Sequence, residues 1–192
     1  EPVDIDTVKW SLEDFGKMWT FDDIPFERLE KLYNFKPTQE WLEHVQKSAL
    51  QFGWGCSAAF VSGNGLVMTN HHCGRGDLYK VEKEGENLLR DGFYAATLEE
   101  ERKIPGLFVE QLISITDVTE EITNAMDSVD SDARKVEEKD KRINELQTNY
   151  NEELNLNCRV ISLYNGGKYS LYAYKRYDDV RLVMAPDFQI AA

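Results

Sequence analysis

The stretch GCSAAFVSGNGLVMTNHHC, residues 55–73, holds two of the chain's three cysteines and two of its three histidines. Its apolar segments, residues 57–62 and 65–70, flank Gly63-Asn64. Gly and Asn accept the positive φ that tight hairpin turns require, and apolar segments on either side of such a turn are typical of paired strands. The stretch therefore predicts an antiparallel β-hairpin with one cysteine near each end.

The two cysteines of this hairpin, Cys56 and Cys73, are expected to lie close together, because an antiparallel hairpin brings its ends within bridging distance. In the loop-entropy description, a disulfide here would contribute about 3 kcal/mol, and it would indicate an oxidising compartment. Two reduced cysteines in the core are the alternative. The third cysteine, Cys158, is expected to be a buried strand residue without a partner.

A metal site is the third interpretation of the same residues. Structural zinc sites use Cys and His ligands in pairs at short spacing. On an extended strand, His71 and His72 point to opposite faces and do not converge on one ion. We therefore expect no metal and no cofactor, with a zinc site at His71, His72 and Cys56 as the weaker alternative.

The composition excludes several classes of partner. The chain has 192 residues and a formal net charge of −13, and 42% of its residues are hydrophobic. So acidic a surface repels phosphate backbones and anionic lipid. No apolar run approaches the roughly 20 residues of a membrane helix. The sequence thus indicates a globular protein with a packed core, no nucleic-acid partner and no membrane span.

The rest of the chain combines helical and strand patterns. Apolar residues recur at helical spacing in residues 26–35 and again after Thr38, which is a plausible helix start. Together with the hairpin, the strand patterns make roughly six strands joined by tight turns, an arrangement typical of an antiparallel barrel or sandwich. The strand patterns outside the hairpin are residues 106–116, 157–164, 168–177 and 179–186, with a turn at Asn165-Gly166-Gly167.

Residues 117–155 have a different character. Apolar residues recur there at spacings of mostly three and four, with charged residues between them. This pattern predicts one amphipathic helix, or a helical hairpin with a break near Asp130-Ser131. It favours a helical insertion that packs on the chain's own sheet. A coiled-coil surface for a partner is the alternative.

The chain resembles the bacterial dipeptidyl peptidase 7/11 family from about residue 16 to its end. The matching segments follow in the family's order, and GLVMTNHHC also has the order of apolar strand, Thr, His and Cys found around the general base of chymotrypsin-fold enzymes. The segments that carry the resemblance are MWTFDDIP, EWLEHVQKSAL, GCSAAFVSGNGLVMTNHHC, DGFYAATLEEERKIPGLFVEQL, ITDVTEEI and YSLYAYKRYDDVRLVMAPDFQIA.

The resemblance implies a fold and an activity. It implies a mainly β fold with helices, part of a chymotrypsin-like double β-barrel of antiparallel strands. The family's members are serine exopeptidases that release dipeptides from peptides with a free N-terminus. They are typically homodimers in the periplasm or cell envelope, or secreted, with the signal peptide removed. The expected parts of the catalytic domain are a helical and arm region (1–52), barrel strands (53–116 and 156–192) and a helical insertion (117–155).

The family's catalytic histidine corresponds to His72, and its Asp and Ser lie beyond residue 192. We therefore expect this chain to be the N-terminal portion of a longer protein and to be inactive alone. A non-catalytic half-barrel that binds peptides or proteins is the alternative. Residues that could stand in for the missing partners are Asp77, Asp91, Asp178, Asp179 and Asp187, and, across the hairpin from His72, Ser57.

Overall fold

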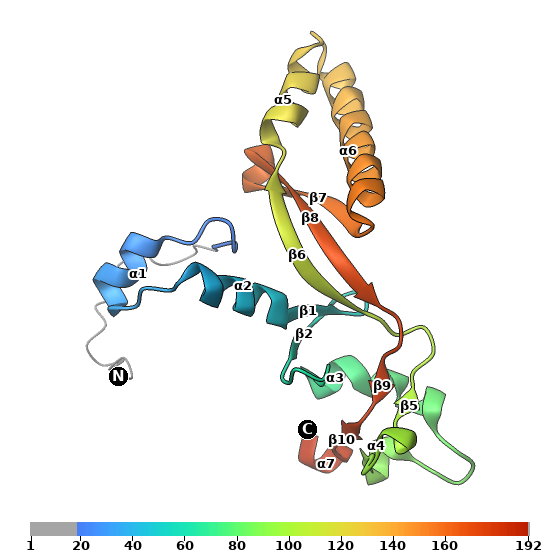
Figure 1. The fold of residues 1–192 in the computed structure, drawn as a ribbon. Coiled ribbons are helices and arrows are strands. Elements are labelled where there is room, and N and C mark those ends of the chain that lie inside the picture. The colour runs from blue at the N-terminus through green and yellow to red at the C-terminus, as the bar shows by residue number, and fades with distance from the viewer. Residues whose placement is uncertain (1–18, 192) are drawn as a thin grey trace. The chain divides into compact units, whose positions relative to one another are not determined.

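A computed structural model describes residues 19–191, and the chain divides into two compact units, Glu1–Lys47 and Ser48–Ala192. The helices of the first unit are α1 (Phe26–Tyr33) and α2 (Gln39–Ser48) (Figure 1). Thr38 caps α2, since its Oγ1 accepts a hydrogen bond from Trp41 N at 3.1 Å. The expected N-terminal helices are confirmed, while residues 1–18 of the expected arm lie outside the described residues.

The second unit is built on a six-stranded antiparallel sheet with the order β3-β2-β1-β6-β8-β7. The edge strands β3 and β7 do not pair with each other within residues 19–191, so this sheet is not closed into a barrel. The antiparallel fold is confirmed, in the form of an open sheet. Its strands are β1 (Ala49–Phe52), β2 (Cys56–Phe60), β3 (Val67–Thr69), β6 (Val109–Asp117), β7 (Asn157–Leu163) and β8 (Lys168–Tyr177).

Two features of the sheet differ from the sequence prediction. Strand β1 lies inside the region expected to be helix or arm, and it connects the β2–β3 hairpin to β6. The hairpin turn is also longer than a two-residue turn, because Val61 N donates to Leu66 O at 2.9 Å and the positive φ of +83° falls at Gly65. The Ser62 hydroxyl supports this loop by accepting the backbone N–H of Leu66.

Residues 71–107 and 181–191 form short elements rather than long strands. The expected strand at 179–186 is two short ones, because β9 pairs with β5 while β10 pairs with β4. The elements of these segments are α3 (His71–Gly74), the 3-10 helix η3 (Arg75–Val81), α4 (Leu88–Asp91), β4 (Phe93–Tyr94), the 3-10 helix η4 (Leu98–Glu100), β5 (Arg102–Lys103), β9 (Arg181–Leu182), β10 (Met184–Ala185) and α7 (Phe188–Ala191).

The insertion between β6 and β7 is a helical hairpin of α5 (Thr119–Asp127) and α6 (Asp132–Leu154), which lie side by side in Figure 1. Ser131 begins α6 by accepting a hydrogen bond from Arg134 N, close to the predicted break. Ile122 and Leu146 are buried in one cluster with Leu171 of β8. The expected packing of this insertion on the chain's own sheet is therefore confirmed.

A second apolar cluster lies where β1 and β6 meet the short elements. Leu50, Leu78 and Val109 are each 5% exposed or less in this cluster. Cys56 and Cys73 pack against it. The end of the hairpin that carries the histidines is thus seated on a core of its own.

Candidate active site

The cysteines of the hairpin are joined in the structure. Cys56 begins β2, Cys73 lies in α3, and their sulfurs form a disulfide with a Cα–Cα distance of 6.1 Å. Strand β2 is paired on both sides, with β1 and β3. The cross-link therefore ties the short helix α3 to an interior strand of the sheet.

His72 precedes Cys73 and is exposed. One of its ring nitrogens lies within 4.8 Å of both cysteine sulfurs. The prediction that His71 and His72 lie on an extended strand is wrong. Asn70 is the last residue with an extended backbone, and His71 and His72 begin the helix α3. Because α3 is anchored by the disulfide, the His72 side chain is presented to solvent from a fixed backbone.

His71 has a different environment from its neighbour. It is half-buried, and its Nε2 is enclosed by protein without a hydrogen-bond partner. A buried ring nitrogen cannot reach a substrate from solvent. Of the two adjacent histidines, His72 has the accessible side chain that a general base requires.

The candidate carboxylates are engaged with other groups. Asp77 forms an ion pair with Lys80 at 2.5 Å, and Asp187 accepts the backbone N–H groups of Gln189 and Ile190 in α7. Within residues 19–191, no hydrogen bond joins His72 to a carboxylate. The remaining candidates also pair with basic side chains: Asp91 with Arg90, Asp178 with Arg176, and Asp179 with Arg181 and Lys103.

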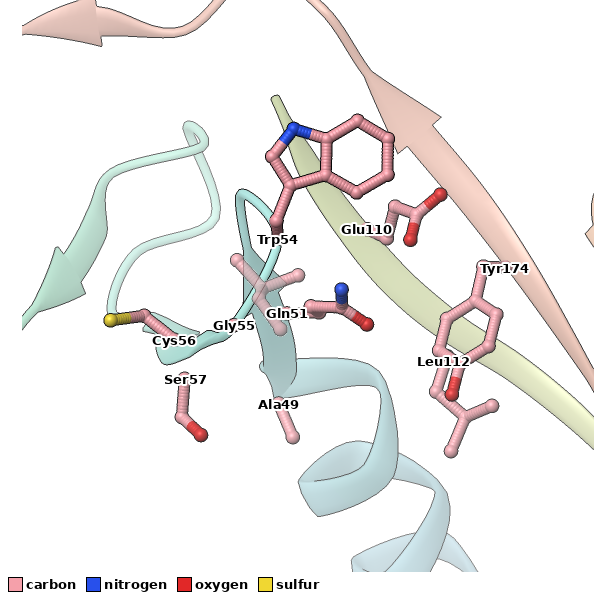
Figure 2. Close-up of a pocket in the computed structure, with 10 residues that line it drawn as sticks. Ala49, Gln51, Trp54, Gly55, Cys56, Ser57, Glu110, Leu112 and Tyr174 are labelled. Atoms are coloured by element: carbon pink, nitrogen blue, oxygen red, sulfur yellow. The ribbon is translucent and has the colours of Figure 1, made fainter. Parts of the chain in front are cut away.

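Ser57 is not directed at His72. It follows Cys56 on β2, and successive strand residues point to opposite faces. The Cys56 sulfur and the Ser57 hydroxyl accordingly point in different directions in Figure 2. Because Cys56 faces His72 through the disulfide, the Ser57 hydroxyl lies on the other side of the strand.

A pocket of about 410 Å³ lies on the sheet beside the hairpin, where Trp54 projects from the β1–β2 turn (Figure 2). Trp54 is 85% exposed, and its ring contacts Phe108 edge-on with centroids 5.0 Å apart. An exposed indole beside polar groups is suited to contacts with a peptide. The lining residues with side chains that can bind a ligand are Gln51, Trp54, Ser57, Glu110 and Tyr174.

Glu110, at the wall of this pocket, is the polar feature that the sequence analysis missed. It is 2% exposed, accepts a hydrogen bond from Asn157 Nδ2 at 2.6 Å and pairs with Arg159. The Arg159 guanidinium lies 4.5 Å from the ring centroid of Tyr174, and burial raises the pKa of that phenol. The lone charge in the apolar pattern of residues 106–116 was the available signal.

A second cavity, of about 270 Å³, borders the disulfide itself. Cys56, Cys73, Asp77 and Lys80 line it, together with Phe108. The cavity lies beside both cysteines, where the start of β6 faces η3.

The sequence of this chain matches the profile of a known protein family. The sequence profile of Peptidase S46 matches residues 13–192. The chain belongs to the Peptidase S46 family. This confirms the resemblance found in the sequence, since the curated S46 relatives of the chain are dipeptidyl peptidases.

The curated relatives carry two names. A dipeptidyl-peptidase 7 from Porphyromonas gingivalis is 34% identical over 182 residues, covering 88% of this chain and 25% of that protein. An Asp/Glu-specific dipeptidyl-peptidase from Capnocytophaga gingivalis is 32% identical over 165 residues, covering 83% of this chain and 23% of that protein. The chain thus spans about a quarter of the length of these S46 relatives.

Solved structures with a similar fold come from the same group. Porphyromonas endodontalis DPP11 in complex with the dipeptide Arg-Glu superposes with a TM-score of 0.64 and 29% identity, over 77% of this chain and 22% of that one. The same protein in complex with substrate gives a TM-score of 0.68 and 27% identity, over 90% of this chain and 27% of that one.

In this S46 chain, none of the helices in residues 19–191 has the length and apolar character to span a bilayer.

Proposed function

We propose that this chain supplies the general base, His72, of a serine dipeptidyl peptidase that releases dipeptides from the free N-terminus of peptides. The observation that carries the proposal is S46 membership together with an exposed His72 beside the anchored disulfide. Relatives named as dipeptidyl peptidases, and a DPP11 crystallised with a dipeptide, support the substrate class.

In this proposal, His72 takes the hydroxyl proton of a serine as that serine attacks the peptide carbonyl. An aspartate holds the imidazole in the orientation that transfer requires. As the resemblance to the dipeptidyl peptidase 7/11 family implies, we place both partners in the protein beyond residue 192. The disulfide's part is to hold the α3 backbone, so that the imidazole keeps its position while a proton moves.

The proposal includes the setting of the enzyme. The chain would be the N-terminal part of the catalytic domain, with the β strands of residues 53–116 and 156–192 contributing to a barrel completed by later residues. A disulfide suits the periplasm, the cell envelope or the exterior. We further propose that the complete enzyme is a homodimer, as the sequence resemblance implies.

The test uses the longer protein that contains this chain, and it compares His72→Ala with the matched variant His71→Ala. We expect His72→Ala to lower kcat/KM for a peptide with a free N-terminus by about three orders of magnitude or more. His71→Ala should keep kcat/KM within about tenfold, because the His71 side chain is half-buried and its Nε2 is enclosed by protein. Dipeptide release followed by mass spectrometry measures both.

Two results would overturn the assignment. If His71→Ala removes activity while His72→Ala keeps it, the general base is the wrong residue of the pair. If the longer protein releases no dipeptides at all, the non-catalytic binding module becomes the better description. Circular dichroism of both variants separates a chemical loss from a loss of folding.

A further inference from the structure

Three side chains of the types that bind zinc meet at the end of the hairpin. A ring nitrogen of His72 lies within 4.8 Å of both sulfurs of Cys56 and Cys73, which are bonded to each other. Thiolate sulfur and imidazole nitrogen are the ligands that zinc prefers in proteins. We propose that reduction of the Cys56–Cys73 disulfide converts this cluster into a Zn²⁺ site with two thiolate ligands and one imidazole ligand.

The redox step balances with a dithiol as the reductant. The dithiol gives two electrons and two protons to the Cys56–Cys73 bond, the S–S bond breaks, and the reductant becomes a disulfide. Both cysteines are then thiols. Coordination of Zn²⁺ displaces their two protons to solvent, so metal binding is favoured as the pH rises.

The geometry requires little movement. Zn–S bonds of about 2.3 Å and Zn–N bonds of about 2.0 Å in a tetrahedron place the donor atoms about 3.5 to 3.8 Å apart. The His72 nitrogen is already within 4.8 Å of both sulfurs, and the Cys56 and Cys73 Cα atoms are 6.1 Å apart. Rotation of the two cysteine side chains separates the sulfurs without requiring the Cα atoms of Cys56 and Cys73 to move apart.

The hairpin keeps the ligands together after the cross-link is broken. Cys56 pairs with Phe52 of β1, and Ala58 pairs with Thr69, two residues before His71. These ladder hydrogen bonds do not depend on the disulfide. The ladder therefore keeps Cys56 in place and brings the chain to Thr69, and Cys73 of α3 packs against the apolar cluster that includes Leu50 and Leu78.

Access and competition also favour a site at this cluster. Both cysteines line the cavity of about 270 Å³, and His72 is exposed to solvent. Asp77 lines the same cavity but is paired with Lys80. The third thiol, Cys158, is buried in the cluster under α5 and α6, where burial raises its pKa.

One consequence rests on the proposed function. A His72 nitrogen bound to zinc has no lone pair to accept a serine proton, so the reduced, zinc-loaded enzyme would be inactive. Metal binding itself does not depend on that role. The experiment therefore measures the metal, and its failure would leave the peptidase proposal standing.

The experiment titrates the 192-residue chain with Co²⁺, the spectroscopic stand-in for Zn²⁺, in a Cys158→Ala background. One sample is disulfide-bonded, and the other is reduced with dithiothreitol and freed of it by anaerobic gel filtration. We expect near-ultraviolet thiolate-to-cobalt charge transfer at one equivalent in the reduced sample alone, and its loss when Zn²⁺ is added. His72→Ala should weaken cobalt binding at least tenfold, while His71→Ala should leave it within about twofold.

A double variant, Cys56→Ser with Cys73→Ser, tests whether the two thiols bind the metal. Like the reduced chain it has no disulfide, but unlike that chain it has no thiol at either position. We expect it to stay folded by circular dichroism and to show no charge-transfer band. The proposal is overturned if the reduced chain shows no such band, if the double variant binds Co²⁺ as tightly as the reduced chain, or if the chain unfolds on reduction.

Discussion

Glu110 carries a carboxylate that is 2% exposed in the six-stranded sheet. A buried charge is stable only when other groups replace its lost hydration. Asn157 and Arg159 do so from β7, reaching across β8, where Tyr174 lies on the same face under the guanidinium. This cluster links three strands through side chains as well as through the backbone.

We predict that Glu110→Ala lowers the free energy of unfolding by about 2 to 3 kcal/mol, because it leaves Arg159 and Asn157 without their common acceptor. Glu145→Ala is the matched control, since Glu145 pairs with Arg142 on an exposed helix surface and should cost less than about 1 kcal/mol. Urea unfolding followed by circular dichroism measures both. Equal effects of the two substitutions would contradict a structural role for the cluster.

Residue-scale prediction from the sequence depended on how local the relevant contacts are. Cys56 and Cys73 lie near the two ends of one hairpin, so the sequence pattern predicted that they are close together. The structure confirms this with a disulfide between them. The partners of Glu110 lie 47 and 49 residues away along the chain. The lone charge in the apolar pattern marks Glu110, but it does not identify the distant residues that enclose its carboxylate.

Among the elements, β5 is fixed to the loop before α4 by one pair of residues. The Arg102 guanidinium donates to both carboxylate oxygens of Glu86, at 2.5 and 2.8 Å, and also to Val81 O. The hydrogen bonds from Arg102, and next the backbone N–H of Lys83, lower the pKa of Glu86 from 4.5 to about 2. The folded chain therefore holds Glu86 ionised in acid that would protonate it in the unfolded chain.

The sign of the pH dependence follows from that shift. Between pH 4.5 and about 2, the unfolded chain binds a proton at Glu86 more readily than the folded chain does. We predict that the contribution of Glu86 to stability is complete above about pH 4.5 and is lost as the pH falls through about 2. Thermal unfolding at a series of pH values should therefore show the advantage of the natural chain over Glu86→Gln shrinking in this range.

Glu86→Gln is the appropriate comparison because it keeps the shape of the side chain but cannot ionise. The other carboxylates with lowered pKa values, Asp91, Glu99 and Asp179, titrate in both proteins and cancel in the difference. If the two unfolding curves stay parallel from pH 5 to pH 2, Arg102 does not stabilise the ionised form of Glu86.

Element-scale prediction was best where the periodic pattern was long. The helical hairpin of α5 and α6 follows from an apolar repeat over some forty residues, with Ser131 at the break. Strand β1 has four residues and directly follows a helix, which is too short for alternation to be visible. α3 was not predicted either, because a helix of four residues is too short to show a helical periodicity.

At the scale of the whole molecule, the six-stranded sheet is open within residues 19–191. The chain spans about a quarter of the length of its S46 relatives. The known activity of those relatives belongs to proteins about four times as long. The proposed function therefore requires residues from elsewhere in a longer protein. The intact mass of the native protein, compared with the 22.2 kDa of this chain, tests that requirement directly.

The proposed function predicts different activities for the 192-residue chain and for the longer protein that it requires. We expect the 192-residue chain to release no dipeptides, because among residues 19–191 no hydrogen bond joins His72 to an aspartate or a serine. The longer protein should release dipeptides from a peptide with a free N-terminus and none from the same peptide acetylated at that end. Dipeptide release by the short chain at a comparable rate would mean that the catalytic groups lie within residues 1–192, and the assignment of serine and aspartate to later residues would be wrong.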